Sequence, residues 1–396
     1  MAKAKVQYNH IDAVTLIAAL FLMVMSVGIV YSASSSYALE RWGTSGKLLG
    51  NHAAKVMLGF VLMLAAMRID YHKLRRWSKI ILLCVVVSLV ITRILGGELN
   101  GAARWLRLWG FGIQPSEFAR IALIVHLAVM LSFRGDRVRD FTTGYLPLMT
   151  WIVTVTVLVL VQPGFSTGSM IFLVSMLMLF LGGVKLSHLG LTLGGLIPAL
   201  LLYMVSASYR MQRVMDYIAG LFWETTVTKT THQVFQGLIG FANGGLFGLG
   251  PGNSKQRELF LPESYGDFVY AVVGEEYGLL GAVGVLFLFL MILVRGLKIA
   301  QYARDDFGRY LALGITSSIV LYAVVNAGVT LGVLPTTGLP MPFISYGGSS
   351  MVVSSIMIGI LLNISAQTDL HPRQTAGTDG TVPIRPERSP AVGKVY

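Results

Sequence analysis

Long apolar blocks separated by short polar segments run along almost the whole chain. The blocks lack the period-two alternation of membrane-barrel strands, and a backbone inside a bilayer must otherwise be helical. The pattern predicts an all-α integral membrane protein, a polytopic bundle of about ten transmembrane helices with a long outward-facing loop between helices seven and eight. The predicted spans are 13–32, 52–68, 78–95, 117–133, 145–162, 168–182, 186–206, 268–294, 308–332 and 347–366. A re-entrant pair would give a similar pattern at 168–182 and 186–206.

The composition supports this class and excludes others. Apolar residues make up 54% of the chain and charged residues 13%, which is about half the charged fraction of a soluble domain. The net charge of +12 comes mostly from loops and the tail, and no basic module with interleaved aromatic residues is present. We therefore expect no nucleic-acid partner. The single cysteine, Cys84, excludes a disulfide within the chain.

Basic residues gather in alternate loops and predict an orientation. Cytoplasmic loops of membrane proteins carry an excess of Lys and Arg. By this rule both termini are cytoplasmic and the loop from about 207 to 267 faces outward. The basic loops are 68–79, 134–139, 185 and 295–309. We treat 1–366 as a single transmembrane domain and 367–396, which is rich in proline and polar residues, as a disordered cytoplasmic tail.

The first outward-facing stretch with candidate chemistry is 100–120. Arg104 and Trp105 fit either an interfacial aromatic belt with snorkelling arginines or a rim that contacts a phosphate headgroup. Pro115 and the residues after it predict the start of a helix. Glu117 and Arg120 lie three residues apart and are expected to form an ion pair on one helix face.

The second stretch, 244–267, closes the long outer loop. Its glycines allow the backbone to approach a ligand closely, although a flexible hairpin would need the same residues. Asp267 stands at the mouth of the eighth span, where it is either a helix N-cap or a functional carboxylate, or both. Farther along that helix, Glu275 is expected to face a cavity continuous with the loop and Glu276 to pair between helices. The other charged residues of the stretch are Lys255, Arg257 and Glu263.

The third stretch, 334–350, contains three prolines and three glycines among hydroxyl residues that include Ser345 and Ser349. Such a sequence cannot form a regular helix at membrane depth, so its backbone must be buried in protein or line a polar cavity. Together the three stretches support two hypotheses. One is an outer-leaflet enzyme that acts on a lipid-linked substrate carrying its own diphosphate leaving group. The other is a transporter or flippase with a carboxylate proton relay.

These stretches resemble the SEDS (shape, elongation, division, sporulation) family of bacterial cell-wall polymerases, whose members include FtsW of division and RodA of elongation. The resemblance covers the chain from the first span to about residue 366. Its most specific part is Leu334–Ser350, followed by Asn100–Trp105 with Gln114–Glu117, and by Leu261–Phe268 with Gly274–Gly278.

The resemblance implies a ten-helix peptidoglycan glycosyltransferase of the bacterial plasma (inner) membrane, which polymerises lipid II on the outer face. Asp267 would be the general base that deprotonates the acceptor 4-hydroxyl, and undecaprenyl diphosphate would leave with inversion. The implied partners are lipid II, a class B penicillin-binding transpeptidase and other divisome or elongasome membrane proteins. The expected substrate-binding residues are Arg104, Trp105, Lys255, Arg257, Glu263, Ser345 and Ser349, with Glu117, Arg120, Glu275 and Glu276 as structural or cavity residues.

Two departures from the family pattern stand near the site. Tyr265 and Gly266 occupy positions that are usually His-Thr, and Gly164 stands where a turn usually has Asp. The segment 252–256 favours the division branch over the elongation branch, whereas the residues Thr337–Pro340 of the third stretch slightly favour elongation. A lipid II flippase and a non-catalytic divisome scaffold stay as alternatives. No cofactor or metal-ligand set is predicted, and the sequence leaves open whether a divalent cation assists the diphosphate.

Overall fold

The computed structural model describes residues 10–368 and 370, except 96, 100–101, 109–110, 163, 206–210, 212–214, 216, 219–228 and 257–264. Within this part, each of the ten predicted spans coincides with a long helix. Eight of the described helical segments are long and apolar enough to cross a membrane, and α6 is a shorter apolar helix; the number of spans stays a prediction. The helices are α1 (Ala13–Trp42), α2 (Lys47–Arg68), α3 (His72–Leu95), α4 (Pro115–Arg134), α5 (Leu146–Val161), α6 (Phe165–Leu181), α7 (Leu186–Val205), α10 (Val269–Gln301), α11 (Asp306–Thr330) and α12 (Gly348–Ala366).

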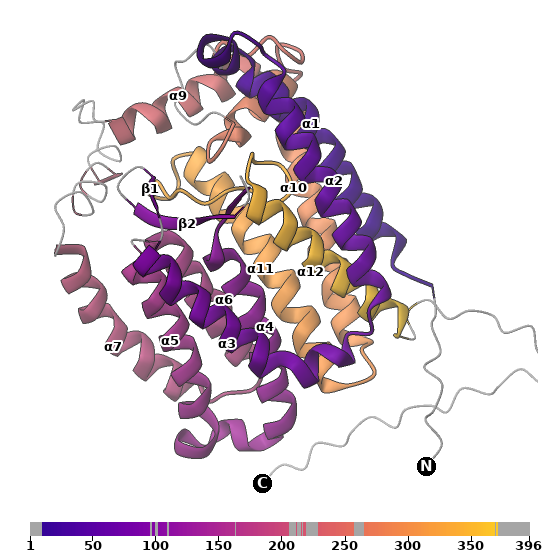
Figure 1. Cartoon of the computed structure of the whole chain (residues 1–396), viewed down its shortest axis with the longest axis vertical. Helices are drawn as coiled ribbons and strands as arrows, with labels where there is room; N and C mark the ends of the chain where they lie inside the picture. Colours follow the sequence, from indigo (N-terminus) through magenta and orange to yellow (C-terminus); the bar gives the residue numbers. More distant parts are fainter. Residues whose placement is uncertain are drawn as a thin grey trace, which may run out of the picture.

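The centre of the bundle is formed by α4, α11 and α12, and Figure 1 shows α11 and α12 running through its middle. Most of the apolar window of each of these three helices is buried, whereas α2 and α3 bury only 22% of theirs. The peripheral helices instead expose large apolar side chains such as Phe21 and Val24 of α1. A hydrocarbon environment stabilises such a surface, so the peripheral helices form the lipid-facing layer.

A small antiparallel sheet departs from the all-helical expectation. It consists of β1 (Gly97–Leu99), β2 (Ala102–Leu108) and β3 (Phe111–Ile113), in the order β1-β2-β3. The sheet joins α3 to α4 and lies at the end of these helices that is nearer to α9 (Figure 1). The stretch 100–120, for which we left open an aromatic belt or a rim that contacts a phosphate headgroup, is therefore built partly on strands.

The long loop between α7 and α10 contains a further helix, α9 (Lys229–Gly244), which packs against the start of α10. The turn after α9 fills a break in α10 at Gly278, whose backbone has φ 65° and ψ −167°. The amides of Leu279 and Leu280 donate to the carbonyls of Gly245 and Leu246 instead of to their own helix, and the amide of Leu249 donates to the carbonyl of Glu275. The turn thus satisfies backbone groups that the break would otherwise leave unpaired in the membrane.

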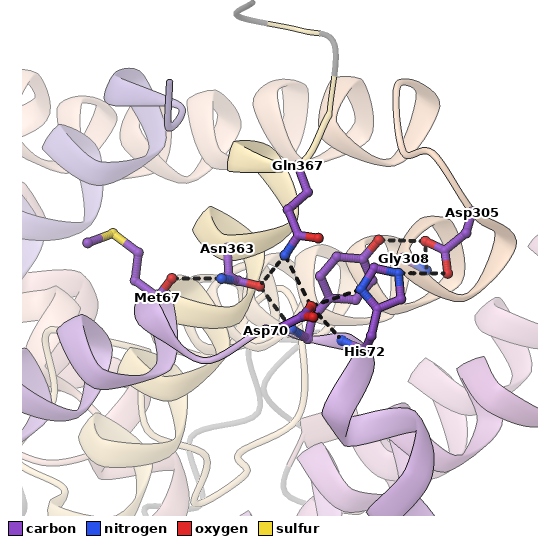
Figure 2. Close-up of polar contacts among 8 residues, drawn as sticks. Met67, Asp70, His72, Asp305, Gly308, Asn363 and Gln367 are labelled. Atoms are coloured by element: carbon purple, nitrogen blue, oxygen red, sulfur yellow. Dashed lines mark hydrogen bonds and ion pairs between the residues drawn. The ribbon is translucent and has the colours of Figure 1, made fainter. Parts of the chain in front are cut away.

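Three chain segments meet at the opposite end of the bundle, in the cluster that Figure 2 shows. Asn363 of α12 donates to the carbonyl of Met67 and accepts from the amide of Tyr71, over 2.7 and 2.9 Å. Tyr71 in turn donates its hydroxyl to Asp305, the N-cap of α11, over 2.5 Å. These bonds connect the α2–α3 turn, the α10–α11 turn and the end of α12.

The packed fold continues slightly past the expected domain boundary at 366. Gln367 is buried and donates to Asp70 and Asn363, and Thr368 is buried beside it. The rest of the predicted tail, apart from residue 370, lies outside the described residues. At the same end, Asp12 caps α1 and pairs with Arg295 of α10, which fixes the entry of the chain into the bundle.

Candidate functional site

Asp267 lies in the turn that leads into α10, next to the irregular third stretch. The N-cap of α10 is Phe268, so the interpretation of Asp267 as the helix cap is wrong. Its side chain is half-buried. A Cβ atom placed on Gly338 would come within 3.2 Å of Oδ2 of Asp267. The carboxylate therefore lies beside Gly338 of the third stretch, at a point where any larger residue would crowd it.

Two sets of hydrogen bonds hold this turn and the third stretch together. The side-chain amide of Asn326, from α11, donates to the carbonyls of both Asp267 and Leu339, each over 2.8 Å. The amide of Tyr346 donates to the carbonyl of Tyr265 over 2.9 Å. These bonds hold the turn before α10, the helix α11 and the third stretch in fixed positions relative to one another, next to the carboxylate.

Aromatic rings and one lysine line the neighbourhood of this turn. Tyr265 packs against Tyr37 and Tyr346, with ring centroids 5.5 and 5.6 Å apart. Lys55 of α2 holds its ammonium 4.0 Å from the centroid of the Tyr346 ring. A cation over an aromatic face is attracted by the ring quadrupole. Sequence reasoning missed Lys55, because one lysine in an apolar helix gives no local sign of what it contacts.

Ser345 and Ser349 are buried, and their hydroxyls already accept hydrogen bonds from the backbone. Ser345 accepts from the amide of Met341 over 2.7 Å, within the third stretch. Ser349 accepts from the amide of Gln114 over 2.9 Å and so joins α12 to the start of α4. Phe343 takes a positive φ of 64°, which fits the prediction that this backbone is irregular. The two serine hydroxyls therefore hold the backbone of the third stretch and of its junction with α4 in place.

Glu117 and Arg120 form the predicted ion pair, with 3.2 Å between Oε2 and Nη2. Both side chains are buried at the centre of the bundle. The guanidinium of Arg120 also lies 4.1 Å from the ring of Tyr322 on α11 and 3.4 Å from the hydroxyl of Ser354 on α12. The pair thus links α4, α11 and α12 beneath the third stretch.

Glu275 and Glu276 are both buried, and each has its own partner. Glu275 accepts from the hydroxyl of Ser254 and from the amides of Lys255 and Gln256. It therefore binds the loop that precedes α10 and does not line an open cavity as we expected. Glu276 accepts from the hydroxyl of Ser32 on α1, which agrees with the predicted contact between helices. The start of α10 is therefore tied to the loop on one side and to α1 on the other.

The remaining predicted residues are only partly described. The side chain of Lys255 is exposed. Trp105 of β2 packs over Gly112 of β3, where a Cβ atom would come within 3.2 Å of the indole ring. Arg104 lies on β2, but its side chain is outside the described part, as are Arg257 and Glu263. Among the described residues, no group of three or more His, Cys, Asp or Glu side chains could hold a metal ion.

The comparisons with known proteins agree over almost the full length. The FtsW/RodA/SpoVE family model, described as "Cell cycle protein", matches residues 12–370. The chain is 39% identical over 364 residues to a "Probable peptidoglycan glycosyltransferase FtsW" of Geobacter metallireducens, covering 91% of this chain and 96% of that protein. It is 34% identical over 360 residues to "Stage V sporulation protein E" of Bacillus subtilis, covering 89% and 96%.

Solved structures with the same fold are also found. A chain from a structure described as "Structural coordination of polymerization and crosslinking by a peptidoglycan synthase complex" superposes with a TM-score of 0.73 at 23% identity, over 90% of this chain and 97% of that one. The rod shape determining protein RodA of Thermus thermophilus superposes with a TM-score of 0.64 at 25% identity, over 88% and 95%. The overall arrangement of the helices is thus shared with these structures.

Proposed function

The chain belongs to the FtsW/RodA/SpoVE family of cell cycle proteins, and from this membership we propose that it is a peptidoglycan glycosyltransferase that polymerises lipid II. The observation that carries the proposal is the close approach of the Asp267 carboxylate to Gly338. There, a carboxylate at the start of a membrane helix meets the most specific motif of the family. A base held in such a place can act on a hydroxyl of a membrane-bound sugar.

In the proposed reaction Asp267 accepts the proton of the acceptor sugar's 4-hydroxyl. The oxygen attacks the anomeric carbon of the donor, the bond from that carbon to the diphosphate oxygen breaks, and undecaprenyl diphosphate leaves with inversion. The carboxylate is positioned by Asn326 through the backbone, so the acceptor does not have to order the loop itself. Such preorganisation is what an enzyme needs to convert binding into rate.

Lys55 is our first choice for the cation that faces the diphosphate. Its ammonium is held over Tyr346, whose amide is bonded to the turn that carries Asp267. A neighbouring positive charge stabilises a leaving diphosphate, because negative charge builds up on it in the transition state. Arg104, Lys255 and Arg257 stay as proposed additional contacts, whereas Ser345 and Ser349 are proposed to position the third stretch.

The carboxylates of Glu117, Glu275 and Glu276 are bonded to fixed partners, and this favours a polymerase over a flippase. A proton relay needs acidic residues that can change partners across the bilayer. In the described part of the chain Glu117 is paired with Arg120, Glu275 is bonded to the outer loop and Glu276 to α1. Asp267, at the mouth of α10, is the carboxylate best placed for chemistry.

We further propose that the site faces the outside of the cell and that both termini are cytoplasmic, as the distribution of basic residues predicts. A class B penicillin-binding transpeptidase is the proposed partner. Support comes from the fold shared with a chain of a complex described as coordinating polymerization and crosslinking. The FtsW names of relatives favour a role in septal synthesis during division.

The function is tested by incubating the purified full chain, with its cognate transpeptidase, with lipid II in detergent and separating the products by length. A detergent solution has no second leaflet, so a flippase would leave the substrate unchanged. Glycan polymer that depends on this chain supports the proposal. Unchanged lipid II, under conditions in which an established lipid II polymerase makes polymer, would contradict it.

A further inference from the structure

A cavity of about 520 Å³ lies beside the connection between α4 and α5, lined by Phe133, Arg134, Arg137 and Thr143. The connection consists of two short helical turns, η1 (Gly135–Arg139) and η2 (Phe141–Tyr145). It lies at the end of the bundle opposite α9 (Figure 1). The cavity therefore belongs to neither the Asp267 site nor its surroundings.

The two arginines of the cavity have no carboxylate partner among the described residues. Nε of Arg134 donates to the carbonyl of Thr143 over 3.3 Å, and neither Arg134 nor Arg137 takes part in an ion pair of the described chain. Two acids, Asp136 and Asp140, lie on the same connection, and Asp140 accepts from the hydroxyls of Thr142 and Thr143. The cavity thus presents guanidinium donors that form no ion pair within the described chain and can bind an anion.

Further cations from α3 border the cavity. The guanidinium of Arg75 lies 4.1 Å from the ring of Phe133, a residue of the cavity wall. Lys79 lies one helical turn farther along α3 and so projects on the same face as Arg75. An anion in the cavity would therefore meet positive charge from α3, α4 and η1.

Apolar surface adjoins these charges. The side chain of Phe133 is 66% exposed, and Leu146, the first residue of α5, is 49% exposed. A soluble anion would gain nothing from this exposed surface, whereas the acyl chains of a lipid would cover it. Basic pockets between transmembrane helices near the membrane surface bind anionic headgroups in this way.

We propose that this cavity binds the phosphate headgroup of an anionic phospholipid, with Arg134 and Arg137 as the donors and the acyl chains against Phe133. The site goes beyond the polymerase reaction and uses none of its residues. The proposed orientation places this end of the bundle at the inner leaflet, but the binding itself does not depend on that orientation. Occupancy would anchor the α4–α5 connection to the membrane surface.

The test measures lipid adducts of the purified full chain by native mass spectrometry, with phosphatidylglycerol, phosphatidylcholine and inorganic phosphate as separate probes. Phosphatidylglycerol should bind in preference to phosphatidylcholine. The double variant Arg134→Gln/Arg137→Gln should weaken phosphatidylglycerol binding by roughly tenfold or more, since each basic residue near an anionic surface adds about fivefold. The matched control is Arg68→Gln/Arg309→Gln, which removes the same charge from exposed positions at the same end of the bundle.

Equal weakening by the two double variants would reduce the effect to net charge and overturn the proposal, as would equal binding of the two lipids. Binding of inorganic phosphate alone, with the same dependence on Arg134 and Arg137, would reassign the cavity to a soluble anion and overturn the lipid assignment. Should the double variant fail to fold, Arg137→Gln alone changes an exposed side chain and should still weaken binding by about fivefold.

Discussion

Asn326 donates a hydrogen bond from its side-chain amide to the backbone carbonyl of Asp267, over 2.8 Å. The same amide group donates to Leu339, so one buried side chain of α11 fixes both the proposed catalytic turn and the third stretch. A shift of Asp267 or of Leu339 would break one of these two hydrogen bonds. The position of the carboxylate is therefore set by the core of the bundle and not by the loop alone.

Replacing Asn326 with Ala should lower the polymerisation rate of the folded protein and destabilise it by about 1–3 kcal/mol, because buried carbonyls lose their donor. Polymerisation rate and unfolding midpoint are measured on the same sample. Asn363→Ala is the matched control, since Asn363 also bridges two segments, but at the far end of the bundle. A comparable loss of rate in both variants would mean that the effect is only structural.

Removing the charge of Lys55 should weaken the reaction without unfolding the protein. Lys55→Met keeps most of the stem over Tyr346, and kcat/KM for lipid II should fall by roughly tenfold or more as a charged contact to the diphosphate is lost. Lys47→Met serves as the control. Lys47 lies on α2, as Lys55 does, and its ammonium also faces an aromatic ring, that of Trp42, but its position is more exposed. Wild-type kinetics in Lys55→Met would exclude Lys55 from the site.

Gly278 should tolerate no side chain. A Cβ atom there would lie 2.4 Å from the amide nitrogen of Gly248 and 2.5 Å from the carbonyl oxygen of Leu246, at a positive φ of 65°. Gly278→Ala should therefore destabilise the protein by about 1–3 kcal/mol or more. Gly284→Ala, in the same helix but with nothing within 4 Å, should be neutral or stabilise by about 0.5–1 kcal/mol. Thermal unfolding of the two variants gives the comparison.

Acid should loosen the cluster at the α2–α3 turn. Burial alone would raise the pKa of Asp70, but hydrogen bonds from His72 and Gln367 outweigh it and hold the pKa below its ordinary value of 3.8. A carboxylate with a lowered pKa stabilises the fold above its unfolded pKa, and this contribution is lost as the pH falls through the folded pKa. The thermal unfolding midpoint of wild type, measured as a function of pH, should fall as the pH drops below about 4. This fall should be smaller in Asp70→Asn than in the control variant Asp306→Asn.

The positions of the long helices could be predicted because a bilayer forces apolar blocks to be helical. The Glu117–Arg120 pair could be predicted because it depends only on helical spacing. The β-sheet could not: Ala102–Leu108 is a short segment whose strand character depends on pairing with its neighbours. Contacts with neighbouring strands decide whether so short a segment forms a strand, since strand propensity alone is a weak signal.

The candidate site was predictable only in part, for the same reason. Asp267 stood out because a carboxylate at the mouth of a membrane span needs an explanation. Asn326 and Lys55 did not, because their partners lie far away in the sequence. For Ser345 and Ser349 the sequence could not tell which groups the hydroxyls bond to within the protein. In the structure they accept from the backbone amides of Met341 and Gln114, and a contact with substrate stays a prediction.

The most direct test of the central claim compares initial rates of lipid II polymerisation by wild type and Asp267→Asn, at equal amounts of folded protein. Asparagine keeps the size and polarity of the side chain but cannot accept the proton of the acceptor hydroxyl. If Asp267 is the general base, the rate should fall by about 10²–10⁴-fold while the unfolding midpoint stays unchanged. A rate within a few-fold of wild type would show that Asp267 is not the base and would contradict the proposed mechanism.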